Sequence, residues 1–282
     1  MRVLRIGHSP DPDDAFMFYG FACGAVQMEG YEIEHVLEDI ATLNVRATRG
    51  ELEVTALSAA TYPHVAGRYR LLATGASLGI GYGPVIVCKK ESIASELTGR
   101  TIAVPGKSTT AYLLLRLYLE DFQAVEIPFD RIPQAVRAGE VDAGLLIHEG
   151  QLTYAEMGLV PILDLGARWR EETGFPLPLG LDAVRRDLAE DLQARISQAL
   201  AESIRYAFAH EEEALDYAMQ FGRGIDREIC RRFVRMYVNE YTLDLGGEGK
   251  RALLALYQRA YDRGLIPAVP PLDPTFPGKT PS

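Results

Sequence analysis

The sequence predicts an α/β protein of two lobes, with mixed, mostly parallel sheets and a hinged cleft between the lobes. The first half of the chain alternates short apolar runs with amphipathic stretches, the pattern of the βα units that build parallel sheets. A second such series begins at residue 101, and a late strand returns to the first series. A chain of 282 residues suffices for two modest domains.

The elements of the first lobe have clear local signals. Ser9 and Pro10, with the acidic residues after them, favour a helix start. Asp39 and Gly50 are typical of the two ends of a helix. We expect strands at 3–7, 31–37, 54–57, 71–74 and 84–89, with helices over 15–23 and between 39 and 50.

A glycine series over 75–83 leads into the second lobe, and an irregular segment over 166–178 leads out of it. The predicted larger lobe is therefore discontinuous, with residues 1–88 and 184–282, and the smaller inserted lobe has residues 89–183. The smaller lobe is expected to hold strands at 101–104, 125–128 and 143–147 and a helix over 108–120, and the strand at 179–184 leads back. The larger lobe then adds helices over 188–209, 211–221, 226–241 and 248–263, and a Pro-rich, extended and partly disordered tail from 267.

Charge and hydropathy exclude two classes of partner. Acidic residues outnumber basic ones 39 to 29, for a formal net charge of −10, whereas nucleic-acid binding needs a basic stripe. The arginines at 227, 231, 232 and 235 recur at helical spacing in a segment that also carries Asp226, Glu228 and Glu240, as on a solvated helix face. No segment has the ~18 uncharged apolar residues of a membrane helix. We expect neither nucleic acid nor a membrane as partner.

The three cysteines are far apart and odd in number, and no two histidines share metal-ligand spacing on one helix. Neither a metal site nor a disulfide framework is therefore predicted. A basic start at Arg2 and Arg5 precedes three aspartates within 11–14, where a signal peptide would be apolar. A cytoplasmic location is therefore expected.

Three strand-to-helix junctions, at 9–14, 57–58 and 108–110, are rich in Ser, Thr and Asp. Ligands of doubly wound sheets bind at the carboxyl ends of the strands. We expect all three junctions to point into one cleft, where a polyhydroxylated or carboxylated small molecule fits better than an apolar one.

The segment 106–109, Gly-Lys-Ser-Thr, is not a nucleotide-binding loop, because the Walker pattern needs a glycine where Thr101 stands. Ser108, Thr109 and Thr110 nevertheless place hydroxyls and free backbone N–H groups at a helix N-terminus, which can hold a carboxylate. The alternative is an ordinary N-cap.

His148 is the candidate general base. It follows the apolar run 143–147, which is too short for a helix, and so lies at the carboxyl end of a buried strand. A neutral imidazole there can accept a proton at pH 7. A satisfied or solvent-exposed histidine is the alternative, and Glu149 either orients the ring or caps the next helix. No Gly-x-Ser-x-Gly segment supports a hydrolase triad.

Taken in order, the motifs resemble those of the 1,4-dihydroxy-6-naphthoate synthases of the futalosine route to menaquinone, over nearly the whole chain. The marks are Gly7-His8-Ser9-Pro10-Asp11-Pro12-Asp13-Asp14, Val36-Leu37-Glu38-Asp39 with Leu43-Asn44, Ala103-Val104-Pro105-Gly106 with Thr109-Thr110-Ala111-Tyr112, Ile147-His148-Glu149 with Thr153-Tyr154, Leu163-Asp164-Leu165-Gly166, Leu177-Pro178-Leu179-Gly180 and Tyr237-Val238-Asn239.

This resemblance implies a two-lobed fold like that of periplasmic binding proteins of type II, a cytoplasmic enzyme and no metal or organic cofactor. It also implies a lyase reaction, in which cyclic dehypoxanthine futalosine yields 1,4-dihydroxy-6-naphthoate and dihydroxyacetone. His148 matches the proton acceptor of the family. Ala56, Leu57 and Ser58, with Thr109 and Thr110, match its substrate-contacting segments.

The chain departs from the family pattern at three places. Asp13 stands where Asn is frequent, Ala56 where Lys is frequent, and Gly150-Gln151 where Ser-Arg follows the histidine and glutamate. Two potential cations are thereby lost, so the partner of the substrate carboxylate is open. The helix N-terminus at Ser108 is the candidate, and Ser9 is a further expected contact.

Two other functions compete with this one. A non-catalytic solute-binding protein for a small organic acid would share the fold and the cleft. A chorismate dehydratase of the same pathway would share the architecture, and the His148-Glu149 segment favours the synthase over it. A homodimer is left open.

Overall fold

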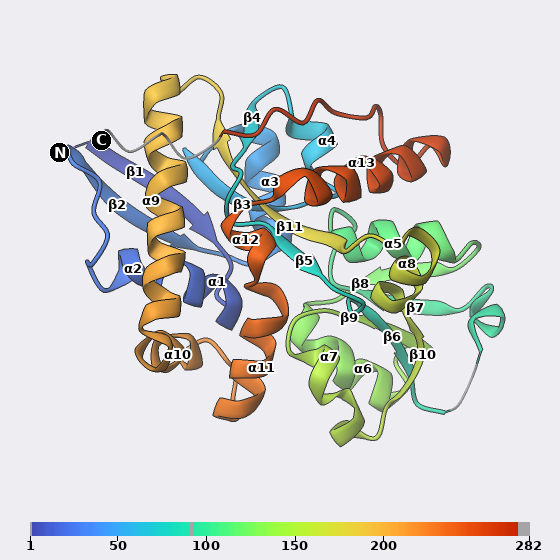
Figure 1. The fold of residues 1–282 in the computed structure, drawn as a ribbon. Helices are drawn as coiled ribbons and strands as arrows, with labels where there is room; N and C mark the ends of the chain where they lie inside the picture. Colours follow the sequence, from blue (N-terminus) through green and yellow to red (C-terminus); the bar gives the residue numbers. More distant parts are fainter. Residues whose placement is uncertain (1, 91–92, 276–282) are drawn as a thin grey trace.

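Two β-sheets in separate lobes organise the computed structural model, which describes residues 2–90 and 93–275 (Figure 1). The sheet of the first lobe has the order β2-β1-β3-β11-β4, and β5 also pairs with β11; the sheet of the second lobe has the order β10-β6-β9-β7-β8. The strands are β1 (Arg2–His8), β2 (Tyr31–Leu37), β3 (Val54–Ser58), β4 (Tyr69–Leu71), β5 (Ser77–Gly79), β6 (Val85–Cys88), β7 (Thr101–Val104), β8 (Gln123–Glu126), β9 (Ala143–Leu146), β10 (Val160–Asp164) and β11 (Leu177–Arg185).

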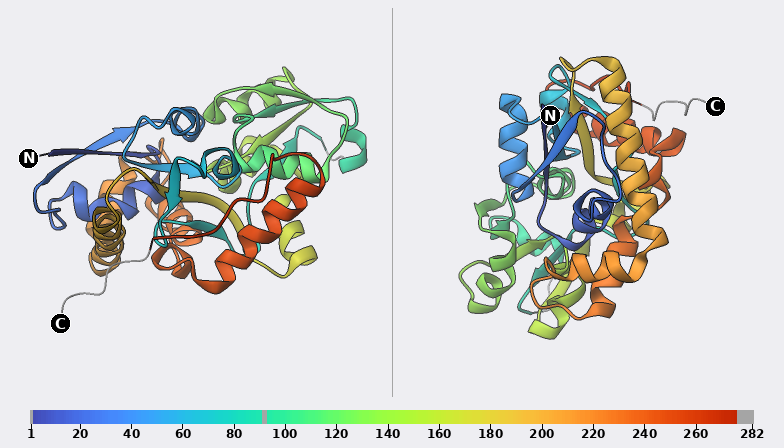
Figure 2. Two further views of the ribbon diagram at one scale, coloured as in Figure 1. Left: turned by 90° about the horizontal axis from the view of Figure 1, so that it is seen from above. Right: turned by 90° about the vertical axis from the view of Figure 1, so that its left-hand side faces the viewer.

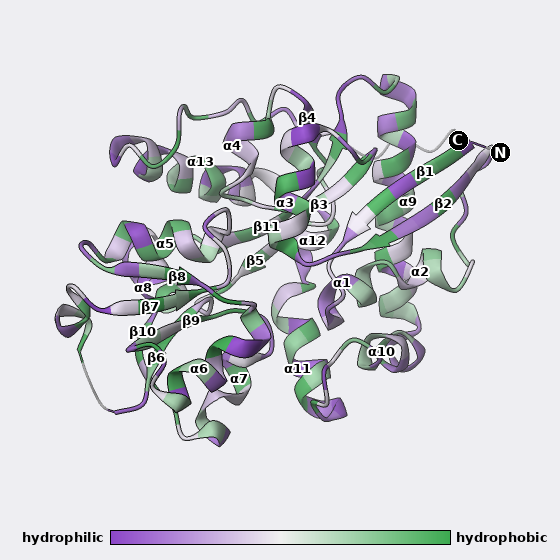
Figure 3. Cartoon of the chain, turned by 180° about the vertical axis from the view of Figure 1, so that it is seen from behind, coloured by the Kyte–Doolittle hydropathy of each residue, from purple (hydrophilic) through white to green (hydrophobic). Residues whose placement is uncertain are grey.

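Helices cover both faces of the first sheet (Figure 2). Helices α1 and α2 pack with α9, α10 and α11 on one face, and α3 packs on β3 from the other. Hydrophobic and hydrophilic residues are interspersed along helices α9 and α13, as expected of helices with one buried face (Figure 3). The helices are α1 (Pro12–Met17), α2 (Tyr19–Ala22), α3 (Ile40–Arg49), α4 (Tyr62–Val65), α5 (Thr110–Tyr118), α6 (Ile132–Ala138), α7 (Gly150–Thr153), α8 (Leu165–Thr173), α9 (Glu190–Ala209), α10 (Glu211–Met219), α11 (Arg227–Tyr237), α12 (Glu240–Leu243) and α13 (Gly246–Asp262), with 3-10 turns at Ala94–Leu97, Phe129–Arg131 and Tyr154–Met157.

The chain crosses between the lobes twice, and the crossovers differ from the predicted boundaries at 88 and 184. Strand β6, which we assigned to the larger lobe, pairs with β9 and β10 in the second sheet. Strand β11, of which all but the end was assigned to the smaller lobe, pairs with β3, β4 and β5 in the first. Local sequence identifies a strand but not its partners, which explains the difference. Both sheets are mixed, because β6 and β11 run antiparallel to their neighbours.

Local signals set several element ends. Asp39 caps α3 by accepting hydrogen bonds from the N–H groups of Ala41 and Thr42, and Gly50 closes it in the left-handed conformation with φ of 71°. The helix expected over 15–23 is instead two short helices, since the backbone of Phe18 leaves helical geometry. The helix expected over 226–241 likewise ends at Tyr237, and Asn239 caps the short α12.

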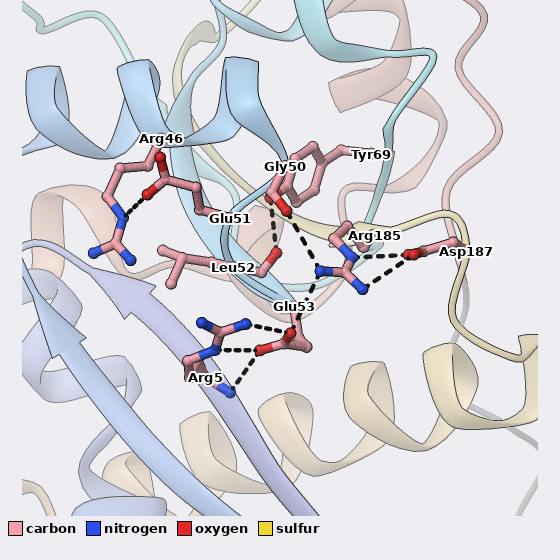
Figure 4. Close-up of polar contacts among 9 residues, drawn as sticks. All are labelled: Arg5, Arg46, Gly50, Glu51, Leu52, Glu53, Tyr69, Arg185 and Asp187. Carbon is pink, nitrogen blue, oxygen red and sulfur yellow. Dashed lines mark hydrogen bonds and ion pairs between the residues drawn. The ribbon is translucent and has the colours of Figure 1, made fainter.

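An ion-pair network joins three strands of the first sheet (Figure 4). It lies at the end of the sheet opposite the carboxyl ends of β1 and β3. Glu53 accepts hydrogen bonds from the Arg5 guanidinium at 2.8 and 2.9 Å. Arg185 at the end of β11 lies 3.5 Å from the same carboxylate and also binds Asp187 at 2.8 Å. The network holds β1, β3 and β11 together, and these strands carry site residues at their other ends.

The Pro-rich tail packs on the first lobe as far as residue 275 (Figure 1). Asp273 binds the Arg186 guanidinium at 2.7 and 2.9 Å, and Thr275 forms a bridge with Leu72 beside β4. The tail is extended here as expected, and its remaining residues lie outside the described part. Within the described residues, no helix has the length and apolar character needed to cross a bilayer.

Candidate active site

A cavity lies between the two lobes, where the carboxyl ends of β1, β3, β7 and β9 meet. Its volume, counted with its open mouth, is about 730 Å³, within the range typical of small-molecule sites. The three Ser/Thr/Asp junctions that the sequence indicates all contribute to its lining, and the first lobe adds β11, Phe233 and Tyr237. Residues from both lobes therefore face one another across the cavity.

His148 lines this cavity directly after β9, as expected, with a side chain that is 15% exposed. Its Nδ1 lies 3.1 Å from Oδ2 of Asp11, which comes from the loop after β1. Its Nε2 is buried and has no hydrogen-bond partner among the described residues. If the Asp11 carboxylate accepts a hydrogen bond from Nδ1–H, the free lone pair is on Nε2, which is the arrangement of a general base held by an acid.

Packing and backbone geometry fix the His148 ring. The ring centroid lies 4.7 Å from that of Phe129 and 6.4 Å from that of Phe233, so aromatic rings of both lobes flank it. The backbone φ of His148 is 52°, a left-handed conformation that costs free energy in a non-glycine residue. Such conformations persist only where the surrounding structure holds them, and they are found mostly at functional sites.

Glu149 does not orient the His148 ring. Its Oε1 accepts a hydrogen bond from Arg223 at 3.2 Å, and Arg223 also donates to the Pro10 carbonyl at 2.9 Å. The Arg223 guanidinium further lies over the Phe129 ring, 4.6 Å from its centroid. Since Arg223 belongs to the first lobe and Glu149 and Phe129 to the second, this arginine bridges the lobes beside the site.

Ser58 is positioned by Asn44 of α3. The Asn44 amide donates to Ser58 Oγ at 3.0 Å, and its oxygen accepts from the Ser58 N–H at 2.8 Å. The Ser58 hydroxyl proton has no acceptor among the described residues, and Ser58 lines the cavity beside Ala56 and Leu57. Ser58 is therefore a hydrogen-bond donor available to a ligand.

At the start of α5, backbone groups rather than hydroxyls are free. Thr109 Oγ1 donates to the Gly106 carbonyl and Thr110 Oγ1 to the Leu179 carbonyl, both at 2.7 Å. The N–H groups of Thr110 and Ala111 have no acceptor among the described residues, and both residues line the cavity. These two N–H groups, at the positive end of the helix dipole, can bind an anionic oxygen.

Ser108 is not in the lining of this cavity, so its expected role as a substrate contact is not supported by its position. Its hydroxyl and carbonyl lie near the Asn44 amide, at 3.3 and 3.4 Å, and Ser108 lines a separate hollow instead. Thr109, and not Ser108, is the N-cap of α5.

Buried carboxyl groups form one wall of the cavity. Burial raises the pKa of Asp182 to about 8. Burial, together with the Asp11 carboxylate, raises the pKa values of Asp13 and Asp14 well above the ordinary range. Asp14 also accepts a hydrogen bond from the Ser9 N–H at 2.6 Å. The described part of the lining contains neither lysine nor arginine, so neutral donors have to hold any bound carboxylate.

Asp11, Asp13 and His148 offer ligand atoms that all lie within 4.8 Å of one another. Two carboxylates and an imidazole form a reasonable donor set for a divalent transition metal. The sequence prediction considered cysteines and histidines at metal-ligand spacing, whereas this group joins Asp11 and Asp13 at the start of α1 to His148 after β9 in the other lobe. A metal there would compete with the base role, because it would occupy the His148 ring.

Several lining residues escaped the sequence reasoning. The sequence places Asp11 in the 9–14 junction that faces the cleft but not beside His148, and it places Asp182 only within a strand. Tyr237 of α11 hydrogen-bonds to the Gln151 side chain at 2.6 Å and so connects the lobes. The available signal was an acidic residue within an apolar strand at 182, where alternation alone does not explain it.

Residues 4–262 match the family described as Menaquinone biosynthesis. A Thermus thermophilus protein named 1,4-dihydroxy-6-naphtoate synthase is 46% identical over 98% of this chain and 100% of its own length. A Streptomyces coelicolor protein of the same name is 39% identical over 98% of this chain and 99% of its own.

Solved structures agree in fold. A crystal structure of an Archaeoglobus fulgidus protein has a TM-score of 0.90 and 53% identity, covering 94% of this chain and 98% of that one. The alkanesulfonate-binding protein of Xanthomonas axonopodis has a TM-score of 0.71 at 14% identity, covering 95% and 96%, and shows that the fold is that of periplasmic binding proteins. From its sequence match and its two-lobed architecture, the chain belongs to the menaquinone biosynthesis family.

Proposed function

We propose that this protein is a 1,4-dihydroxy-6-naphthoate synthase, a carbon–carbon lyase that converts cyclic dehypoxanthine futalosine to 1,4-dihydroxy-6-naphthoate and dihydroxyacetone. The family and the names of two full-length relatives support the activity. The observation that carries the proposal is the His148–Asp11 pair, in which Nε2 of a held imidazole is unpartnered at the wall of a cavity between the lobes.

In the proposed reaction, Nε2 of His148 accepts a proton from the bound substrate. The Asp11 carboxylate stabilises the imidazolium that forms, as the acid does in other acid–histidine pairs. The electron pair left on the substrate moves into the developing aromatic ring as the bond to the sugar remnant breaks. The remnant leaves with the electron pair of the broken bond, and the proton on His148 is then returned to it to give neutral dihydroxyacetone. Aromatisation provides driving force, so the protein mainly has to position the substrate and remove the proton.

The substrate carboxylate would be bound by neutral donors. The N–H groups of Thr110 and Ala111 and the hydroxyl of Ser58 are free donors at one edge of the cavity. In this role they replace the cations that the family frequently has at Ala56 and Gln151. Oriented backbone donors in a site without bulk water bind anions well, because they need no reorganisation.

Turnover of the cyclic futalosine tests the proposal. The purified protein should release a product with naphthoate absorbance, and His148→Ala should lower kcat by a factor of about 10² to 10⁴, the usual contribution of a general base. His64→Ala is the matched control, since His64 is exposed on α4 and its side chain has no polar partner in the described structure. It should leave the rate unchanged.

Two outcomes would contradict the proposal. Binding of the cyclic futalosine without product would favour a solute-binding protein, and product from chorismate would favour a dehydratase. The cytoplasmic location, the homodimer and the lack of a cofactor stay predictions, for fractionation, sedimentation and metal analysis to test.

A further inference from the structure

Asp182 is a buried acid in the cavity that the proposed proton transfer does not use. It lies on β11, opposite Ala56 of β3 in the sheet register, and it is 2% exposed. It belongs to the cavity lining, and neither of its carboxylate oxygens has a hydrogen-bond partner among the described residues. Buried polar groups are almost always paired, so an acid without a partner at the wall of a ligand cavity indicates a partner that arrives with the ligand.

The protein makes space for this carboxyl group. A Cβ atom on Gly75 would lie 2.0 Å from Asp182 Oδ2, so residue 75 has to be glycine for the acid to occupy its position. Gly75 is itself fixed, with φ of 92° and its N–H donating to the Thr242 carbonyl at 2.7 Å. The Asp182 carbonyl accepts from the Leu72 N–H at 2.9 Å. The backbone on both sides of the carboxyl group is therefore held.

The surroundings disfavour a negative charge on Asp182. No cation lines the described part of the cavity, and the Asp14 carboxyl is close enough for the two acids to repel each other when both are ionised. Burial accordingly raises the pKa of Asp182 to about 8. Near neutral pH the group is a carboxylic acid, which has one O–H donor to offer.

We propose that Asp182, as a neutral acid, donates a hydrogen bond to an uncharged oxygen of the bound substrate, a carbonyl or a hydroxyl. This inference rests on the proposed function and adds to it a second recognition element besides the free N–H groups of α5. An uncharged acceptor fits best, because a substrate carboxylate beside Asp13 and Asp14 would meet acids that ionise as the pH rises. Asp182 is thus a substrate-contacting group, and His148 remains the base.

Two substitutions separate donation from other roles. Asp182→Asn keeps the size and supplies an N–H donor, and Asp182→Leu keeps the size and removes the donor. For a neutral donor, Asp182→Asn should keep KM for the cyclic futalosine within about threefold, whereas Asp182→Leu should raise KM by about tenfold or more, the usual effect of one lost buried hydrogen bond. In both variants kcat should change less than KM.

The pH profile gives a readout that a merely structural residue would not alter. KM of the unmodified protein should be constant below the pKa of about 8 and rise above it, because the donor proton is lost there. KM of Asp182→Asn should stay flat over the same range. Fluorescence titration of the unmodified protein with the naphthoate product between pH 6 and pH 9 measures the same pH dependence as a binding affinity and needs no variant. The inference therefore stays testable even if a variant misfolds.

Each failure has a distinct result. An Asp182→Leu protein with unchanged KM overturns the inference, as does an Asp182→Asn protein that is folded but as impaired as Asp182→Leu, which would mean that an ionised carboxylate is required. If the unmodified protein forms no naphthoate from the cyclic futalosine, the proposed function itself fails, and the inference fails with it.

Discussion

Replacing Asp182 by Asn should stabilise the protein at neutral pH. The ordinary pKa of an aspartate is 3.8, and burial raises that of Asp182 to about 8. Between these two values the folded protein binds a proton that the unfolded chain has released, so this residue lowers stability progressively as the pH rises from about 4 to about 8. Asn has no proton to gain and therefore no such cost.

The size of the effect follows from the two pKa values. At pH 7 the difference from 3.8 is 3.2 units, and at 1.36 kcal/mol per unit the cost is about 4 kcal/mol. At pH 4.5 the same reasoning leaves only about 1 kcal/mol. Asp182→Asn should therefore gain stability at pH 7 and little at pH 4.5.

Urea unfolding followed by circular dichroism measures this directly, for the unmodified protein and the variant at both pH values. The matched control is Asp187→Asn, since Asp187 is exposed and its bond to the Arg185 guanidinium holds the pKa of that carboxyl below the ordinary value. The control should be slightly less stable than the unmodified protein at pH 7. Equal stability gains of Asp182→Asn at pH 7 and pH 4.5, or no gain at all, would refute the reasoning.

Three further predictions concern the site. Asp11→Asn should lower kcat by about 10- to 100-fold with little change in KM, because the imidazole of His148 loses the carboxylate that orients it; steady-state kinetics would show an unchanged kcat if the pairing were irrelevant. Arg223→Ala should raise KM by roughly threefold to tenfold, since the bond to Glu149 that bridges the lobes is lost, and an unaltered KM would argue against this bridge. Zn²⁺ should inhibit turnover by binding Asp11, Asp13 and His148, and it should inhibit the Asp13→Asn variant less. Dialysis against a chelator should leave the activity intact. Activity that is lost on dialysis and restored by zinc would contradict the role of His148 as a base.

The sequence by itself determined the elements and much of the site. Strand β7 and helix α3 lie where they were predicted, because apolar runs, Asp39 and Gly50 act on neighbouring residues. His148 follows a buried strand and faces the cavity for the same local reason. The resemblance of ordered motifs indicated the family, which the comparisons confirm.

The tertiary structure alone decided which distant groups meet. The partner of His148 is Asp11, from the other lobe, although Glu149 is its neighbour in sequence. Asp182 becomes a neutral acid only because β11 crosses into the first sheet and buries it beside Gly75. Strand pairing, desolvation and ion pairing depend on residues far apart in the chain, so no local pattern encodes them, and the pKa of a group is set by whatever the fold packs around it.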